Sequence, residues 1–224
     1  MNGVWALIPV KTLLRAKTRL ASILQPQECA SLSRAMLMDV LAALDGAQHI
    51  ERIAVLTNDS DIASMAAQLG HTVIADESDG GLCDSLNKAA RELAARGATT
   101  LLIMPGDIPT VRAQDIDELL ERHTGGLSIC PASRDGGTNA LVCTPPDALP
   151  FQFGPDSARR HLETAEQHKV PATRLTLQAY LRDIDTPDDL VWLAQQDAEL
   201  NTVRFLHEAG IVARLVPNLK RASA

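Results

Sequence analysis

Residues 99–109 read TTLLIMPGDIP, and this stretch decides the fold. Its apolar run, which ends at Met104, is typical of a parallel β-strand that is buried on both faces. The residues that follow place a turn and a carboxylate, Asp107, directly after that strand. Ligands of open parallel sheets bind at the carboxyl ends of the strands. We therefore expect residues 99–109 to contribute both to the core and to a functional site.

Strand-like and helix-like segments alternate on both sides of this stretch. Strands are expected at residues 4–10, 52–57, 72–75, 99–104, 127–131, 139–143 and 174–177, and helices at residues 32–44, 61–69, 83–96, 114–123, 155–168 and 187–193. This alternation predicts an α/β fold with a mostly parallel central sheet flanked by helices. A chain of 224 residues that is 46% hydrophobic fits one such domain. We place the domain at residues 1–196 and expect residues 197–224 to form a C-terminal helical extension or tail, to which we assign no role.

The bulk composition excludes several classes of partner. A net charge of −7 argues against non-specific binding to nucleic acid or to an anionic membrane, and 3% aromatic residues against stacking on single strands. The apolar runs are too short to span a bilayer, and no signal peptide is visible. The cysteines form no C-x-x-C pair, which fits a reducing compartment. We expect a cytoplasmic protein. The cysteines are Cys29, Cys83, Cys130 and Cys143.

Two acidic motifs are candidates for a metal site. Asp107 follows the central strand, and hard cations such as Mg²⁺ take one or two carboxylates together with substrate phosphates. The alternative is that Asp107 only caps the next turn. Asp183 and Asp185 lie two residues apart, so in an extended segment both side chains face the same side. Asp188 and Asp189 fit better as acids in the first turn of the helix that starts at Thr186-Pro187.

A basic segment and two glycine turns are candidates for anion binding. The segment after the first strand carries four cations in an acidic protein, about the charge that would oppose a triphosphate. The alternative is a solvated surface segment. The turns Gly136-Gly137-Thr138-Asn139 and Phe153-Gly154-Pro155-Asp156-Ser157 offer backbone N–H groups, although ordinary turn chemistry explains them equally well. The cations are Lys11, Arg15, Lys17 and Arg19.

Common catalytic motifs are absent from the sequence. It contains no P-loop, no G-x-G-x-x-G fingerprint and no G-x-S-x-G elbow. The six histidines show no partner pattern, and we expect surface or helix-end positions for them. They are His49, His71, His123, His161, His168 and His207.

Taken in order, the motifs resemble the 2-phospho-L-lactate guanylyltransferase family, which acts in the biosynthesis of the deazaflavin coenzyme F(420). The resemblance extends from residue 4 to about residue 193. The matching segments are Ile8-Pro9-Val10-Lys11, Arg15-Ala16-Lys17-Thr18-Arg19-Leu20, Gly106-Asp107-Ile108-Pro109, Gly137-Thr138-Asn139-Ala140-Leu141, Phe153-Gly154-Pro155 with Ser157, and Asp183-Ile184-Asp185-Thr186-Pro187.

The resemblance implies a nucleotidyltransferase of the glycosyltransferase-A-like fold. GTP would be the donor, and the acceptor would be a phosphorylated three-carbon acid: 2-phospholactate, phosphoenolpyruvate or 3-phosphoglycerate. It also implies a role for each matching residue. Asp107, Asp183 and Asp185 would hold Mg²⁺. Lys11, Arg15, Lys17 and Arg19 would meet the nucleotide phosphates, and Lys17 and Arg19 would be catalytic together with Asp107. Gly81, Leu86 and Asn87 would contact GTP, and Thr138, Gly154 and Ser157 would line the acceptor phosphate.

The implied chemistry needs no histidine or serine triad. The nucleophile would be the acceptor phosphate, which is already largely dianionic at pH 7 because its second pKa is about 6. Attack on the α-phosphorus of GTP would release pyrophosphate. The catalytic task is then to neutralise and align two anions.

Three other readings compete with this one. Another sugar or cofactor nucleotidyltransferase, such as a molybdopterin guanylyltransferase relative, would carry a glycine-rich loop after the first strand, where this chain has a basic segment. A catalytically silent nucleotide-binding domain would be expected to lack the three carboxylates. A dehydrogenase would need the missing dinucleotide fingerprint. The apolar residues of the tail make a homodimer one arrangement that the sequence allows.

Overall fold

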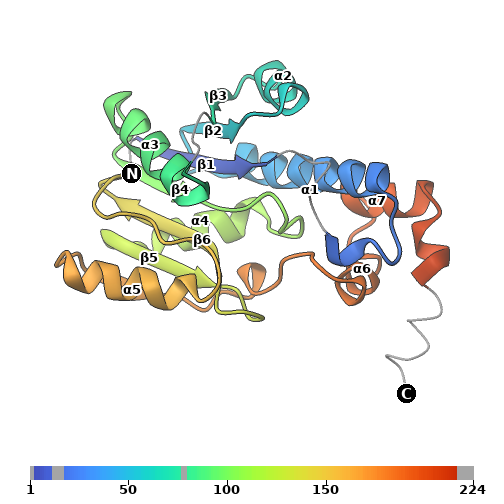
Figure 1. The fold of residues 1–224 in the computed structure, drawn as a ribbon. Helices are drawn as coiled ribbons and strands as arrows, with labels where there is room; N and C mark the ends of the chain where they lie inside the picture. Colours follow the sequence, from blue (N-terminus) through green and yellow to red (C-terminus); the bar gives the residue numbers. More distant parts are fainter. Residues whose placement is uncertain (1–2, 12–17, 77–79, 216–224) are drawn as a thin grey trace.

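A seven-stranded sheet forms the centre of the molecule (Figure 1). The computed structural model describes residues 3–11, 18–76 and 80–215. The strand order is β3-β2-β1-β4-β6-β5-β7, and β6 alone runs antiparallel to its neighbours. The predicted α/β class with a mostly parallel sheet is confirmed. The strands are β1 (Val4–Val10), β2 (Arg52–Thr57), β3 (Thr72–Ala75), β4 (Thr100–Ile103), β5 (Gly126–Pro131), β6 (Thr138–Thr144) and β7 (Ala172–Arg174).

Helices cover both faces of this sheet. Alternate residues of a strand point to opposite faces, so Ala6 and Ile8 of β1 pack with α1, α2 and α4, whereas Trp5 and Leu7 pack with α3 and α5. This is a three-layer arrangement with one core on each side of the sheet. The helices are α1 (Pro26–Gly46), α2 (Ser60–Gln68), α3 (Leu82–Ala95), α4 (Ala113–Glu121), α5 (Ser157–Gln167), α6 (Pro187–Leu193) and α7 (Asn201–Glu208).

Two predicted boundaries differ from the structure. Helix α1 starts at Pro26, ahead of the apolar repeat, because proline suits the first helical position and the Gln25 N–H donates to the Glu28 carboxylate at 2.8 Å. The strand expected at residues 174–177 lies at Ala172–Arg174 instead. Its ladder ends where the Leu175 N–H donates to the Ile129 carbonyl at 2.8 Å. The apolar residues from that point on, Leu175 and Leu177, pack against the core and lie outside the strand.

The C-terminal segment packs onto the main body. Helix α7 lies against α1, and the two share a third apolar cluster with α6 (Figure 1). The buried Asp39 carboxylate accepts the Asn201 N–H at 2.8 Å, the Asn201 Nδ2 at 2.9 Å and the Thr202 N–H at 2.9 Å. The Thr202 hydroxyl donates to the same carboxylate. One acidic side chain of α1 therefore accepts hydrogen bonds from the first two backbone N–H groups of α7, which have no partner within the helix. Within the described ranges, none of the helices has the length and apolarity to cross a membrane.

Candidate metal and substrate site

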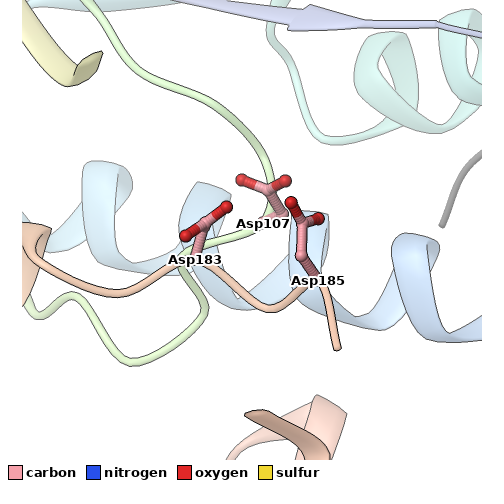
Figure 2. Close-up of side chains that lie close together, drawn as sticks. All are labelled: Asp107, Asp183 and Asp185. Carbon is pink, nitrogen blue, oxygen red and sulfur yellow. The ribbon is translucent and has the colours of Figure 1, made fainter. Parts of the chain in front are cut away.

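Three aspartates from two separate segments converge at the carboxyl end of the sheet. Asp107 lies in the turn after β4, and Asp183 and Asp185 lie in the segment before α6. Figure 2 shows the three carboxylates facing one another across the gap between these segments. Each offers an oxygen within 4.8 Å of the others, which is close enough for all three to hold one ion. The three aspartates that the resemblance assigns to the metal therefore lie together, and their binding of a metal stays a prediction.

Local backbone structure explains this convergence. The Ile184 N–H donates to the Asp107 carbonyl at 3.0 Å and so joins the two segments. The Ile184 side chain is fully buried in the cluster beneath α6, so its neighbours Asp183 and Asp185 both turn the other way. Asp107 does not cap α4, because the N-cap of that helix is Arg112. This leaves the alternative that Asp107 caps the turn directly after β4, which stays a second interpretation beside metal binding.

The electrostatics of the cluster favour a cation. The pKa of Asp183 is raised to about 6, first by burial and then by the neighbouring charges of Asp185 and Asp107. A bound divalent ion removes this repulsion, because it attracts all three groups at once. An all-oxygen, all-carboxylate set suits a hard cation better than a soft one. The donor set therefore fits a divalent metal, as the resemblance implies.

The two glycine turns also lie side by side, as the assignment of Thr138, Gly154 and Ser157 to one phosphate implies. The Asp156 N–H donates to the Asp135 carbonyl at 3.3 Å, and the Ala158 N–H donates to the Gly136 carbonyl at 3.0 Å. The hydroxyls of Thr138 and Ser157 are 2.8 Å apart. The Ser157 N–H also donates to the Gly154 carbonyl, so the structure brings together all three residues expected at the acceptor phosphate.

These acceptor residues differ in how open they are. Ser157 is fully buried and its N–H donates to the Gly154 carbonyl at 3.1 Å, whereas Thr138 is 8% exposed. Gly154 is exposed, and its φ of +122° is a backbone conformation that favours glycine. A contact through Ser157 therefore requires local movement, while Thr138 and Gly154 are nearer to the surface. The assignment of all three to the acceptor stays a prediction.

His161 belongs to this group and was missed in the sequence. Its Nε2 accepts the Gln152 N–H at 2.9 Å, so the ring proton lies on Nδ1, which is 3.3 Å from the Thr138 hydroxyl. Burial, and then the charge of Arg160, lower its pKa to about 4. The expectation of a surface or helix-end position is wrong for His161, which is fully buried within α5. The usable signal was its spacing of one helical turn from Ser157.

The three residues expected to contact GTP, Gly81, Leu86 and Asn87, differ in their surroundings. Gly81 precedes α3 with a φ of +85°, as expected for a turn that enters a helix. The Leu86 side chain is fully buried in the core, and the side-chain amide oxygen of Asn87, Oδ1, accepts the Phe151 N–H at 2.9 Å. Both side chains thus have structural contacts, and their GTP contacts stay predictions.

Only part of the basic segment can be located. Lys11 and Arg19 are exposed at the two ends of the segment that follows β1. Arg15 and Lys17 lie outside the described residues. The contacts of all four with nucleotide phosphates stay predictions.

A pocket of about 240 Å³ lies beside α3, at the carboxyl ends of β2 and β3. Asp76 and Ser85 line it, and the Ser85 hydroxyl donates to the Asp76 carboxylate at 2.5 Å. Larger pockets occur elsewhere, including one of about 450 Å³ near Arg52 and His71 at the amino ends of the strands. Position favours the smaller pocket for a ligand of the site, because parallel sheets bind ligands at carboxyl ends.

Sequence comparison connects this site to a family of enzymes. The sequence model described as "Guanylyl transferase CofC like" matches residues 4–220. A phosphoenolpyruvate guanylyltransferase of Roseiflexus sp. (strain RS-1) is 39% identical, over 90% of this chain and 90% of that protein. A 3-phospho-D-glycerate guanylyltransferase of Phenylobacterium zucineum (strain HLK1) is 34% identical, over 91% and 95%. A 2-phospho-L-lactate guanylyltransferase of Methanothermobacter thermautotrophicus is 32% identical, over 83% and 81%.

Structural comparison supports the fold independently. The crystal structure of a putative nucleotide-diphospho-sugar transferase from Desulfovibrio desulfuricans G20 superposes with a TM-score of 0.78 and 20% identity. The superposition covers 96% of this chain and 99% of that one. The central sheet and its flanking helices are therefore those of a nucleotidyltransferase fold.

Proposed function

We propose a specific reaction for this chain, which belongs to the CofC-like guanylyl transferase family: it joins the GMP unit of GTP to a phosphorylated three-carbon acid and releases pyrophosphate. The observation that carries the proposal is the cluster of Asp107, Asp183 and Asp185 at the carboxyl end of the central sheet, in a member of this family. The product would serve the biosynthesis of coenzyme F(420).

Phosphoenolpyruvate is the acceptor that the relatives favour. Relatives of that name reach 40% identity, compared with 34% for the relative named for 3-phosphoglycerate and 32% for the one named for 2-phospholactate. All three acids carry a phosphate monoester and a carboxylate, so one pocket chemistry recognises them. We therefore place phosphoenolpyruvate first and treat the other two as competing acceptors.

Mg²⁺ is the metal we propose for the three aspartates. A hard divalent ion held there supplies positive charge to the triphosphate of GTP. The chain itself adds the cations Lys11, Arg15, Lys17 and Arg19, which we assign to the nucleotide phosphates, with Lys17 and Arg19 nearest the reacting phosphorus. Gly81, Leu86 and Asn87 belong to the segment assigned to the nucleoside, beside the pocket lined by Asp76 and Ser85.

The acceptor enters from the other side of the aspartates in this proposal. Thr138, Gly154 and Ser157 line its phosphate, and the buried His161 ring contacts the Thr138 hydroxyl through Nδ1. A phosphate dianion is nucleophilic at pH 7 without a general base, since its second pKa is about 6. The neutral, buried His161 therefore orients a hydroxyl and takes no proton from the substrate. The free thiols of all four cysteines support a cytoplasmic location as part of the proposal.

The proposal is tested with purified protein, GTP and Mg²⁺, together with each of the three acids in turn. We expect pyrophosphate release and a product whose mass equals GMP joined to the acid, with the highest kcat/KM for phosphoenolpyruvate. Replacing GTP by CTP or ATP serves as the donor control. Folded protein that releases pyrophosphate with none of the acids would refute the reaction, and preference for another acid would refute only the acceptor.

A further inference from the structure

The Asp189 carboxylate organises the backbone next to the metal cluster. Asp189 is the third residue of α6 and its side chain is 3% exposed. One of its oxygens, Oδ2, accepts the Asp185 N–H at 3.1 Å, the Thr186 N–H at 2.8 Å and the Thr186 hydroxyl at 2.7 Å. Three donors from the segment that carries Asp185 therefore converge on one buried oxygen. This is more than a helix cap requires, because one or two hydrogen bonds suffice for a capping box.

Arg134 connects this carboxylate to a different part of the site. It lies in the loop between β5 and β6, which leads into the first of the two glycine turns (136–139 and 153–157, together the acceptor turns). Its Nη2 donates to both Asp189 oxygens, at 2.6 and 2.7 Å, across a separation of 55 residues. The Ser133 N–H and hydroxyl donate to the Leu181 carbonyl at 3.0 and 2.8 Å, which ties the same loop to the approach to Asp183.

The Arg134–Asp189 ion pair adds a positive charge close to Asp183 and Asp185 of the metal cluster. Burial raises the pKa of Asp189, but the hydrogen bonds from Arg134 and Thr186 outweigh it, and the pKa lies below its usual value. The pKa of Arg134 is raised, mainly through its bond to Asp189 and further by the charges of Asp183 and Asp185. Arg134 thus contributes positive charge within reach of two of the three carboxylates while its own partner stays ionised.

We propose that Arg134 and Asp189 form a positioning pair, which holds Asp183 and Asp185 in the arrangement that binds the metal and joins this arrangement to the loop at the acceptor turns. Neither residue is assigned to metal, nucleotide or acceptor directly. The inference rests on the proposed function in one respect, the assignment of a divalent ion to the three aspartates. Groups that orient metal ligands typically change metal affinity by about 10- to 100-fold when they are removed.

A purely stabilising ion pair is the competing explanation. Such a pair would change the melting temperature when broken and leave metal affinity unchanged. Binding of Mn²⁺, counted by electron paramagnetic resonance of the free ion with GTP present, separates the two explanations without any measurement of turnover. Mn²⁺ serves as the probe because it takes the same oxygen ligands as Mg²⁺.

The variants are chosen to match one another. Arg134→Met removes the charge from a side chain that is 36% exposed, so the fold is expected to survive. Arg134→Lys keeps one nitrogen, and both wild-type hydrogen bonds come from one nitrogen, so partial rescue is expected. Asp189→Asn tests the other partner. Arg122→Met is the control, because it breaks an exposed Arg–Glu pair at the C-terminal end of α4, outside the two segments that carry the aspartates.

We expect the Kd for Mn²⁺ to rise about 10-fold or more in Arg134→Met and Asp189→Asn, by less in Arg134→Lys, and not at all in Arg122→Met. Wild-type Mn²⁺ affinity in a folded Arg134→Met protein would overturn the proposal, even if Asp189→Asn failed to fold. Asp107→Asn reports on the metal site itself. Unchanged Mn²⁺ binding in that variant would refute the metal assignment, whereas its loss together with normal binding in Arg134→Met would refute only the positioning role.

Discussion

The metal cluster and the acceptor turns are built on opposite principles. Asp107, Asp183 and Asp185 are partly exposed, carry like charges and repel one another, so their arrangement gains from an added cation. Thr138, Ser157 and His161 are buried, and in the folded protein they bond to one another as neutral groups. The first region thus needs a ligand to relieve its repulsion, whereas the polar groups of the second are already satisfied within the fold before any acceptor binds. Changes in the first region should therefore remove activity with little loss of stability, whereas changes in the second should lower stability as well as acceptor binding.

The largest expected effect belongs to the metal cluster. Asp107→Asn should lower kcat by about 10³-fold or more, because a charged ligand of the ion is lost. The melting temperature should stay within a few degrees of wild type, since the substitution also relieves repulsion with Asp183 and Asp185. Turnover with GTP and phosphoenolpyruvate, and thermal unfolding, provide the two readouts.

Asp188→Asn is the matched control for this change, because Asp188 is an exposed acid of the first turn of α6. It should leave both readouts unchanged. A large drop in melting temperature in Asp107→Asn would show that Asp107 acts mainly in the fold, and would break the contrast drawn between the two regions.

Acid should destabilise the protein through His161. Its folded pKa of about 4 lies below its ordinary value of 6.5, so the unfolded chain takes up a proton at higher pH than the folded chain. The stability it contributes is complete above about pH 6.5 and is lost as pH falls toward 4, a change of about 2 to 3 kcal/mol between pH 7 and pH 4.5. Urea unfolding at both values, compared between wild type and His161→Gln, measures this change.

The exposed His207 supplies the control, and His207→Gln should keep the wild-type dependence on pH. His161→Gln should lose most of the difference between the two pH values. If wild type and His161→Gln lost the same free energy of unfolding on acidification, His161 would not be the buried neutral group described above.

The smallest effect concerns the hydrogen bond between Thr138 and Ser157. Ser157→Ala removes the buried hydroxyl 2.8 Å from Thr138 and should cost about 1 kcal/mol of unfolding free energy in urea. Ser31→Ala, at an exposed position of α1, controls for the loss of a hydroxyl. If Ser157 also meets the acceptor phosphate, the KM for phosphoenolpyruvate rises as well; an unchanged KM with reduced stability would confine Ser157 to the fold.

Local signals in the sequence marked the two acidic motifs, and the family resemblance then assigned both motifs to one metal site. Asp107 follows an apolar strand, and the spacing of Asp183 and Asp185 places both on one side of an extended segment. The partners of His161, Asp189 and Asp39 were not predictable in this way. His161 bonds a hydroxyl on β6, Asp189 bonds Arg134 across 55 residues, and Asp39 bonds Asn201 across 162 residues. Such contacts depend on tertiary packing, which no short-range pattern records.

Leu86 shows a different limit of sequence reasoning, in which a motif was followed and helix periodicity was not weighed. A leucine next to an asparagine in a matching segment suggests a ligand contact, but the periodicity of α3 turns Leu86 toward the sheet with Ala89, Ala90 and Leu93. Helix periodicity was visible in the sequence, and weighing it against the motif would have predicted a buried side chain.

The most direct test of the metal site is a crystal structure of the protein grown with GTP and Mn²⁺, with data collected for anomalous scattering. The account predicts an anomalous peak at carboxylate bonding distance, about 2.2 Å, from oxygens of Asp107, Asp183 and Asp185. An ion bound to GTP alone, or a peak held by other side chains while these three carboxylates stay uncoordinated, would contradict it.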